Sequence, residues 1–230
     1  MLSSFKTILA TSSLCLITLA AQAASVDDLS PREASSGLKA ALERGADVAV
    51  SQLGVSGGFL NNDKVKIPLP KVLEQAAPLL KMTGRGQQLD DLVVAMNRAA
   101  EAAVPMAKPL LMNAIKGMTF TDAKSIVMGG DNSVTQFFRD KTSAQLATKF
   151  LPLVKATTDR AGLASMYNNT VSQVGKFAQI PPEQKTVELY VTQRAMDGLF
   201  AMIGEEERKI RQNPAAAGSA ILSKVFSFGK

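Results

Sequence analysis

Apolar residues return every three or four positions along most of this sequence of 230 residues. The clearest example is the run that contains Leu38, Ala41, Leu42, Ala49, Val50 and Leu53. This spacing places the side chains on one face of an α-helix, because successive helical residues are rotated by about 100°. The sequence lacks a convincing alternation of apolar and polar residues, which is typical of a half-buried strand. The pattern therefore predicts an all-α fold.

Prolines, glycines and capping residues divide the helical pattern into about nine segments. Ser30 and Glu33 form a capping box around Pro31, and Gly54 ends the first helix. Pro105 is expected to separate two helices, and Pro152 is expected to kink one. The other expected helices cover 70–82, 87–103, 105–117, 119–128, 143–159, 163–178 and 186–212, with short pieces around Phe137 and Phe138 and from Ile221 to Phe226.

We expect these helices to form one compact bundle, a single domain over residues 24–230. Two lobes hinged near Pro181-Pro182 are the alternative arrangement. The one long loop is 54–70, which contains turn-forming glycines and asparagines and two prolines that favour an extended path. A short strand at Val65–Ile67 fits its sequence. The loop is either a functional loop or a strap that covers the core.

The first 23 residues have the pattern of a secretory signal peptide. Lys6 supplies the positive start, an apolar stretch follows, and Ala21-Gln22-Ala23 is a cleavage signal, with cleavage expected after Ala23. The alternative is a retained membrane anchor, but the apolar run is shorter than the roughly 20 residues that span a bilayer. Cys15 does not lie in a lipoprotein cleavage sequence. We therefore expect an exported protein with no transmembrane segment in the mature chain.

The composition excludes several kinds of chemistry. The sequence has no His, and its only Cys lies in the expected signal peptide. Catalytic triads that use His, thiolate sites and His-ligated zinc or haem are therefore excluded. Phosphate-binding and dinucleotide-binding glycine motifs are missing as well, and the aspartates do not complete a calcium loop. We predict no cofactor and no metal, and an enzyme would depend on carboxylates, Lys or Ser.

The mature chain would carry a net charge of about +5, because Lys6 is the only charge lost from the total of +6. Such a surface could contact acidic envelope polymers or anionic lipid, and a mildly basic solvated surface is the alternative reading. Export and the lack of a basic-aromatic motif argue against nucleic-acid binding.

The stretch MNRAAEAAVP, residues 96–105, places Asn97, Arg98 and Glu101 within an apolar helix. Arg98 and Glu101 are three residues apart and can form an ion pair. Because apolar residues surround the trio on nearly every side, we expect this helix to be central and the trio to bond across helices. A ligand pocket and an exposed helix face are the alternatives.

The segment 186–214 repeats this combination. Arg194 and Asp197 lie in or beside its apolar stripe, and Asp197 is a predicted cross-helix partner for Arg98. Glu205–Lys209 and Glu207–Arg211 are spaced as helical ion pairs, and a solvated face is the plainer reading of that charge run.

Five segments together resemble an uncharacterised bacterial family, domain-of-unknown-function family 4197, over about residues 33–228. The segments are GGFLNNDKVKIPLP, MNRAAEAAVP, KGMTFTDAKSIVMGG, FFRDKT and DGLFAMIGEEERKIRQNP. The resemblance implies exported Gram-negative proteins and no established activity, so it assigns no catalytic residue. Phe137 stands where the resemblance leads us to expect Tyr. The positions that match family motifs, without assigned roles, are Asn97, Arg98, Glu101, Asp122, Arg139, Asp197 and Arg211.

The sequence favours a periplasmic helical protein that binds a small ligand or an envelope protein, or has a structural role, without catalysis. It predicts that Arg98, Glu101, Asp122 and Asp197 converge. One alternative is a carboxylate-dependent hydrolase of an envelope polymer, which needs two acidic groups about 5–10 Å apart in a groove. Another is a membrane-surface protein with an amphipathic foot at Ile221–Phe228.

Overall fold

The computed structural model describes residues 31–160, 164–174 and 180–214. Within these ranges the chain forms α-helices and two short 3-10 turns, and no strand. The α-helices are α1 (Pro31–Leu53), α2 (Lys71–Met82), α3 (Gly86–Ala103), α4 (Ala107–Lys116), α5 (Phe120–Met128), α6 (Ser133–Arg160), α7 (Ala164–Val174) and α8 (Val187–Gln212). The all-α prediction is confirmed. The expected signal peptide with its cleavage after Ala23, and the helix from Ile221 to Phe226, lie outside the described residues.

The sequence predicts about nine helices, and one of the expected breaks is absent, because α6 is continuous from Ser133 to Arg160. We predicted a short helix around Phe137 and a separate one from 143. Phe138 and Phe150 are both fully buried, so one apolar face continues through the expected break. The Thr142 hydroxyl in that region donates to the Phe138 carbonyl at 2.6 Å, which satisfies its polar group inside the helix.

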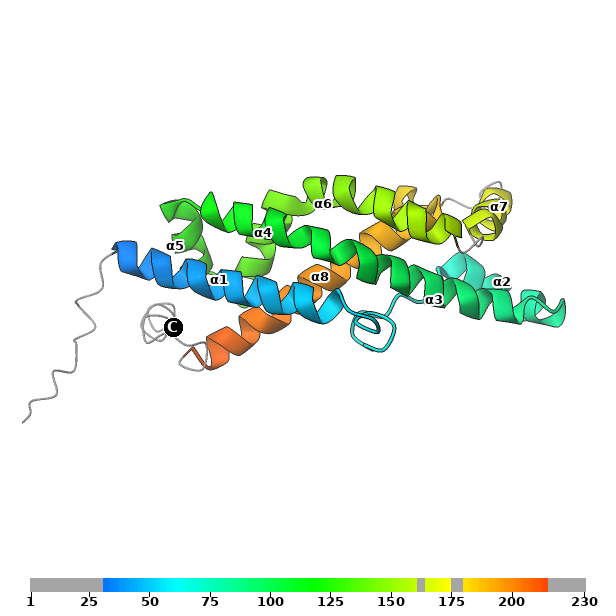
Figure 1. Ribbon diagram of the computed structural model, residues 1–230, viewed down its shortest axis with the longest axis horizontal. Helices are drawn as coiled ribbons and strands as arrows, with labels where there is room; N and C mark the ends of the chain where they lie inside the picture. The colour runs from blue at the N-terminus through cyan, green and yellow to red at the C-terminus, as the bar shows by residue number, and fades with distance from the viewer. Residues whose placement is uncertain (1–30, 161–163, 175–179, 215–230) are drawn as a thin grey trace, which may run out of the picture.

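Two of the proline predictions concern α3 and α6. The break at Pro105 is confirmed, since α3 ends at Ala103 and a 3-10 turn, Val104–Met106, leads into α4. Figure 1 shows α3 and α4 following one another along nearly the same line. Pro152 lies inside α6, which continues past it.

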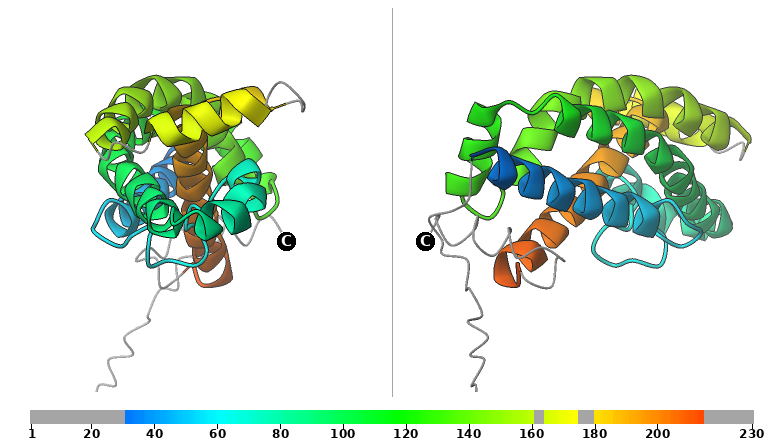
Figure 2. Two further views of the ribbon diagram at one scale, coloured as in Figure 1. Left: turned by 90° about the vertical axis from the view of Figure 1, so that its right-hand side faces the viewer. Right: turned by 60° about the vertical axis from the view of Figure 1, so that its left-hand side comes forward.

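Helix α8 is the central element of the bundle. It packs most extensively on α6 and also contacts α1 and α3. Figure 2 shows it passing through the middle of the molecule when the bundle is viewed along its length. We predicted a central position for the helix over 87–103, and α8 occupies that position instead. Residues before and after Pro181-Pro182, such as Phe150 and Leu199, belong to one buried cluster.

The long loop 54–70 is a strap between α3 and α8 rather than a strand. Two residues of the strap, Phe59 and Ile67, are buried, with exposed fractions of 0% and 1%. The expected strand at Val65–Ile67 is wrong, because side chains of α3 take up backbone groups of the loop that a neighbouring strand would otherwise pair. Gly198 of α8 allows the close packing, since a Cβ atom there would lie 2.6 Å from the Phe59 ring.

Candidate functional site

The polar trio of α3 proves to be the attachment point of the strap. The Glu101 side chain is only 5% exposed, and its Oε1 accepts hydrogen bonds from three backbone positions of the loop. The donors are the backbone N–H groups of Gly57, Phe59 and Leu60, each at 3.1 Å. A carboxylate that accepts several N–H donors does so through strong, charge-assisted bonds. Glu101 therefore replaces the backbone partners that an irregular, half-buried loop would otherwise lack.

Asn97 fixes the other end of the strap in the same way. Its amide nitrogen donates to the Ile67 carbonyl at 2.9 Å, and its Oδ1 accepts from the Ile67 N–H at 2.9 Å. The Asn97 side chain is fully buried. Its two hydrogen bonds to Ile67 resemble those that a neighbouring strand would make. Asn97 therefore takes the place of a neighbouring strand at Ile67.

Arg98 completes the cluster from the solvent side. Its guanidinium donates to Glu101 Oε2 at 2.6 Å and to the Ser56 hydroxyl at 2.8 Å. Burial raises the pKa of Glu101, but the hydrogen bonds from Leu60, Arg98, Phe59 and Gly57 outweigh it, so the pKa lies below its ordinary value. The carboxylate is thus ionised and fully occupied by protein donors. We conclude that this trio is structural. The prediction that it bonds across helices is wrong, because Asn97 and Glu101 bond to the loop and Arg98 pairs with Glu101 of the same helix.

Glu207 and Arg211 form a second buried cluster, at the start of α6. Glu207 is 3% exposed and accepts from the N–H groups of Val134 and Thr135 at 3.0 and 3.1 Å. Arg211 donates to Glu207 Oε1 at 3.0 Å and to the Ile126 carbonyl at 2.8 Å. A carboxylate at a helix N-terminus satisfies N–H groups that have no partner within the helix. The predicted Glu207–Arg211 pair is present, but it joins α8 to α5 and α6 and is not a solvated face.

Asp122 has a local role at the start of α5. Thr119 caps the helix, and the Asp122 carboxylate accepts from the Thr119 N–H at 2.9 Å, which together make a capping box. The hydrogen bonds from the Thr119 N–H and hydroxyl, aided by Lys141, lower the pKa of Asp122. The predicted Thr cap with an acidic first turn is confirmed.

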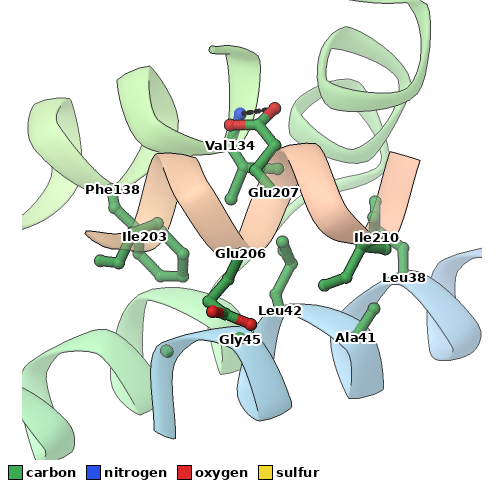
Figure 3. Close-up of a pocket in the computed structure, with 11 residues that line it drawn as sticks. Leu38, Ala41, Leu42, Gly45, Val134, Phe138, Ile203, Glu206, Glu207 and Ile210 are labelled. Carbon is green, nitrogen blue, oxygen red and sulfur yellow. Dashed lines mark hydrogen bonds between the residues drawn. The ribbon is translucent and has the colours of Figure 1, made fainter. Parts of the chain in front are cut away.

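A small cavity lies between α1, α6 and α8, with a volume of about 20 Å³. Figure 3 shows apolar side chains such as Leu42, Phe138 and Ile203 around it, and the Glu207 carboxylate turned away towards the Val134 N–H. The space is close to that of one water molecule and is surrounded by apolar groups, so it is a packing gap and not a ligand site.

The open depression that does collect charged groups is a groove between α6 and α8, with a volume of about 470 Å³. We call it the α6–α8 groove. Its charged side chains are Arg139 from α6, Lys64 from the strap, and Asp197, Glu205 and Arg208 from α8. Lys64 and Arg208 both form ion pairs with Glu205. Arg139 and Asp197 are farther apart, at 3.6 Å.

Arg139 differs from the other cations of the groove in its hydrogen bonding. Its guanidinium carbon lies 4.6 Å from the centre of the Phe200 ring, and its Nη1 lies 3.6 Å from Asp197 Oδ1, which is too long for a hydrogen bond. Within the described part of the chain this guanidinium makes no hydrogen bond. Its side chain is 42% exposed. Stacking on Phe200 holds the charged fork at the surface of the groove with its donors unused.

Asp197 borders a second depression of about 300 Å³, on the side of Arg194 and Tyr190. Arg194 lies over the Tyr190 ring at 5.3 Å, and its Nη1 is 3.9 Å from Asp197 Oδ2. The hydrogen bond that Asp197 does accept comes from the Gln193 side chain, at 3.0 Å. Two arginines stacked on aromatic rings therefore flank one carboxylate.

The structure separates the predicted site residues into four places. Asn97, Arg98 and Glu101 hold the strap, Arg211 the start of α6, Asp122 the start of α5, and Arg139 and Asp197 the α6–α8 groove. The predicted convergence of Arg98, Glu101, Asp122 and Asp197 is therefore wrong. So is the predicted Arg98–Asp197 pair, because Asp197 faces Arg139 and Arg194 while Arg98 pairs with Glu101.

Sequence reasoning missed Lys64, Phe200 and Arg208 as groove residues. Phe200 follows Asp197 by three residues, which places both on one side of α8, but nothing in the sequence brings Arg139 to them. Lys64 reaches Glu205 at 2.9 Å only because the strap folds against α8.

Across residues 31–160, 164–174 and 180–214, no group of three or more acidic, His or Cys side chains is placed to hold a metal ion. No helix in the same ranges is long and apolar enough to cross a bilayer.

The fold and site define an all-α bundle with a charged, solvent-open groove on one side. The chain matches the model of the family described as a protein of unknown function, DUF4197, over residues 28–227. It therefore belongs to the DUF4197 family, as the sequence motifs indicated. No curated protein and no solved structure matches it.

Proposed function

We propose that this protein is a non-enzymatic binding protein of the bacterial periplasm that takes an acidic ligand in the α6–α8 groove. The observation that carries the proposal is the guanidinium of Arg139, stacked on Phe200 at 4.6 Å with its hydrogen-bond donors unused by the described residues. A stacked arginine has lost much of its conformational freedom before a ligand arrives, so less entropy is lost on binding.

The groove favours a ligand that carries both an anion and a hydrogen-bond donor. A planar guanidinium binds a carboxylate or a phosphate through two parallel hydrogen bonds. Asp197 lies 3.6 Å from that guanidinium, and among the described residues it accepts one side-chain hydrogen bond, from Gln193. It can therefore accept an N–H or O–H group of the same ligand. Three cations and two carboxylates line the groove, so it suits a small ligand with few negative charges.

The groove supports the hydrolase alternative less well. Asp197 and Glu205 are the carboxylates that line it, and they are eight residues apart on α8, or about 12 Å along a helix axis. The hydrogen bond from Lys64 lowers the pKa of Glu205, whereas a general acid needs a raised one. Both features fit binding better than glycoside hydrolysis.

Export is part of the proposal and is supported by the signal-peptide pattern of residues 1–23. Cell fractionation with N-terminal sequencing of the mature protein tests it. We expect the protein in the periplasmic fraction with Ala24 as its first residue. Retention of Met1 or recovery from the cytoplasm would refute export without affecting the groove.

Calorimetry and thermal-shift measurements on the chain from Ala24 onwards test the groove. The probes are dicarboxylates, sugar phosphates, inorganic phosphate and acidic dipeptides. Loss of a charge-assisted hydrogen bond costs about 1.5–3 kcal/mol, so Arg139→Ala should weaken binding at least tenfold. Lys149→Ala, an exposed cation on the same helix but outside the groove, is the matched control and should bind normally. Saturable binding that Arg139→Ala leaves unchanged, or no binding of any of these anions, would reject the proposal.

A further inference from the structure

The turn between α2 and α3 exposes two large apolar side chains. Leu79 is 67% exposed and Met82 is 86% exposed, and they lie three residues apart on the last turns of α2. Met82 is the most exposed large apolar side chain in the described part of the chain. We call residues 79–85 the α2–α3 tip. An exposed apolar pair at a protruding turn has no folding advantage, because folding favours burying such groups.

The α2–α3 tip stands clear of the rest of the bundle. Gly84 has a positive φ of 79°, which makes the tight turn, and a Cβ atom added there would meet nothing within 4 Å. Figure 1 shows the turn at one end of the long axis, while α5 lies at the other end. Another large surface can therefore approach the tip without touching α5.

The charges of the α2–α3 tip have one sign. Lys81 and Arg85 are both exposed, and the sequence has no acidic residue between Glu74 and Asp90. Apolar side chains flanked by cations are typical of segments that lie in the interface of an anionic membrane. A second protein surface would have to offer an apolar recess surrounded by acidic groups, whereas a bilayer of anionic lipid offers both properties everywhere.

We infer that the α2–α3 tip docks reversibly on anionic phospholipid surfaces. Leu79 and Met82 enter the boundary between headgroups and acyl chains, and Lys81 and Arg85 meet the phosphates. Two apolar side chains and two charges give weak contact, so the protein exchanges between membrane and solution. The inference is independent of the α6–α8 groove, and it places membrane contact on a different segment from the expected foot at Ile221–Phe228.

Co-sedimentation of the chain from Ala24 onwards with vesicles tests the inference. The vesicles contain phosphatidylcholine alone or phosphatidylcholine with phosphatidylglycerol. We expect binding to the anionic vesicles that falls as salt rises. Binding should fall several-fold in the double variant L79Q/M82Q and in K81Q/R85Q. Circular dichroism should show unchanged melting of both variants, because the four side chains are exposed.

The double variant F120Q/M128Q is the matched control. Phe120 and Met128 on α5 are 64% and 62% exposed, and they should contribute nothing. Equal binding of L79Q/M82Q and the unmodified chain, or equal binding to neutral vesicles, would overturn the inference. So would loss of binding only on deletion of residues 217–230, or a dimer that L79Q/M82Q abolishes. Anion affinity in the groove should be unchanged in the tip variants, which separates this test from that of the proposed function.

Discussion

Replacing Glu101 by Ala should detach the strap and destabilise the whole bundle. The change leaves the N–H groups of Gly57, Phe59 and Leu60 without their shared acceptor, and it removes the partner of Arg98. An unsatisfied buried polar group costs about 1–3 kcal/mol, and three N–H groups lose one acceptor here. The ion pair adds little, because the Arg98 side chain is 39% exposed. Because the three N–H groups share one carboxylate, their costs do not add. We expect the free energy of unfolding to fall by about 4 kcal/mol.

Urea unfolding followed by circular dichroism measures this loss. Glu101→Gln keeps an oxygen acceptor and should lose about half as much, because only the charge assistance disappears. Arg98→Ala should cost about 1 kcal/mol, since salt bridges open to solvent contribute little and the Arg98 side chain is 39% exposed. Limited proteolysis of Glu101→Ala should cut within 54–62 before other sites. A loss below about 1 kcal/mol for Glu101→Ala would refute the assignment of Glu101 as the anchor of the strap.

The same carboxylate should make stability depend on acid. The pKa of Glu101 in the folded protein lies below the ordinary 4.5, so the unfolded chain binds the proton more readily. This contribution is fully present above that ordinary pKa and is lost as the pH falls through the lower, folded value. The difference in stability between the unmodified chain and Glu101→Gln should therefore shrink on acidification. A difference that stays constant down to full protonation would contradict this reasoning.

Three further substitutions test the packing and the other buried anchors. Gly198→Ala places a Cβ 2.6 Å from the Phe59 ring and should lower the free energy of unfolding in urea by about 1–3 kcal/mol. Gly45→Ala in α1, where a Cβ would have contacts at 3.6 Å, is the control and should be neutral or stabilising. Equal effects of the two substitutions would show that Gly198 is not needed for close packing. Glu207→Ala should lower the free energy of unfolding by about 3 kcal/mol and speed hydrogen exchange of the amides at the start of α6. Unchanged protection of those amides would contradict the capping role of Glu207. Asn97→Asp replaces an N–H donor with a charged acceptor beside the Ile67 carbonyl. We expect the free energy of unfolding to fall by about 2–4 kcal/mol at neutral pH and to recover partly in acid. Unchanged stability would argue against the hydrogen bonds between Asn97 and Ile67.

Local chemistry explains which features the sequence could predict. The apolar spacing from Leu38 to Leu53 requires only the geometry of a helix, and α1 buries those residues as expected. The Thr119 cap with Asp122 and the break at Pro105 also depend on neighbours in the chain. The error between Phe138 and residue 143 arose because the composition of a short polar stretch does not say whether the flanking helices stay in phase. Only the packing of Phe138 and Phe150 against the same core decides that.

The sequence by itself determined the all-α class, the family, the absence of histidine, and the presence of a charged trio in an apolar helix. Tertiary structure alone decided what each charge contacts. Glu101 meets loop amides more than 40 positions away in the chain, and Arg139 meets Phe200 and Asp197 across two helices. Helical periodicity fixes the face on which a side chain lies, but the partner depends on how whole helices pack. For that reason the buried trio became the anchor of the strap, while the groove with an available arginine lies between α6 and α8.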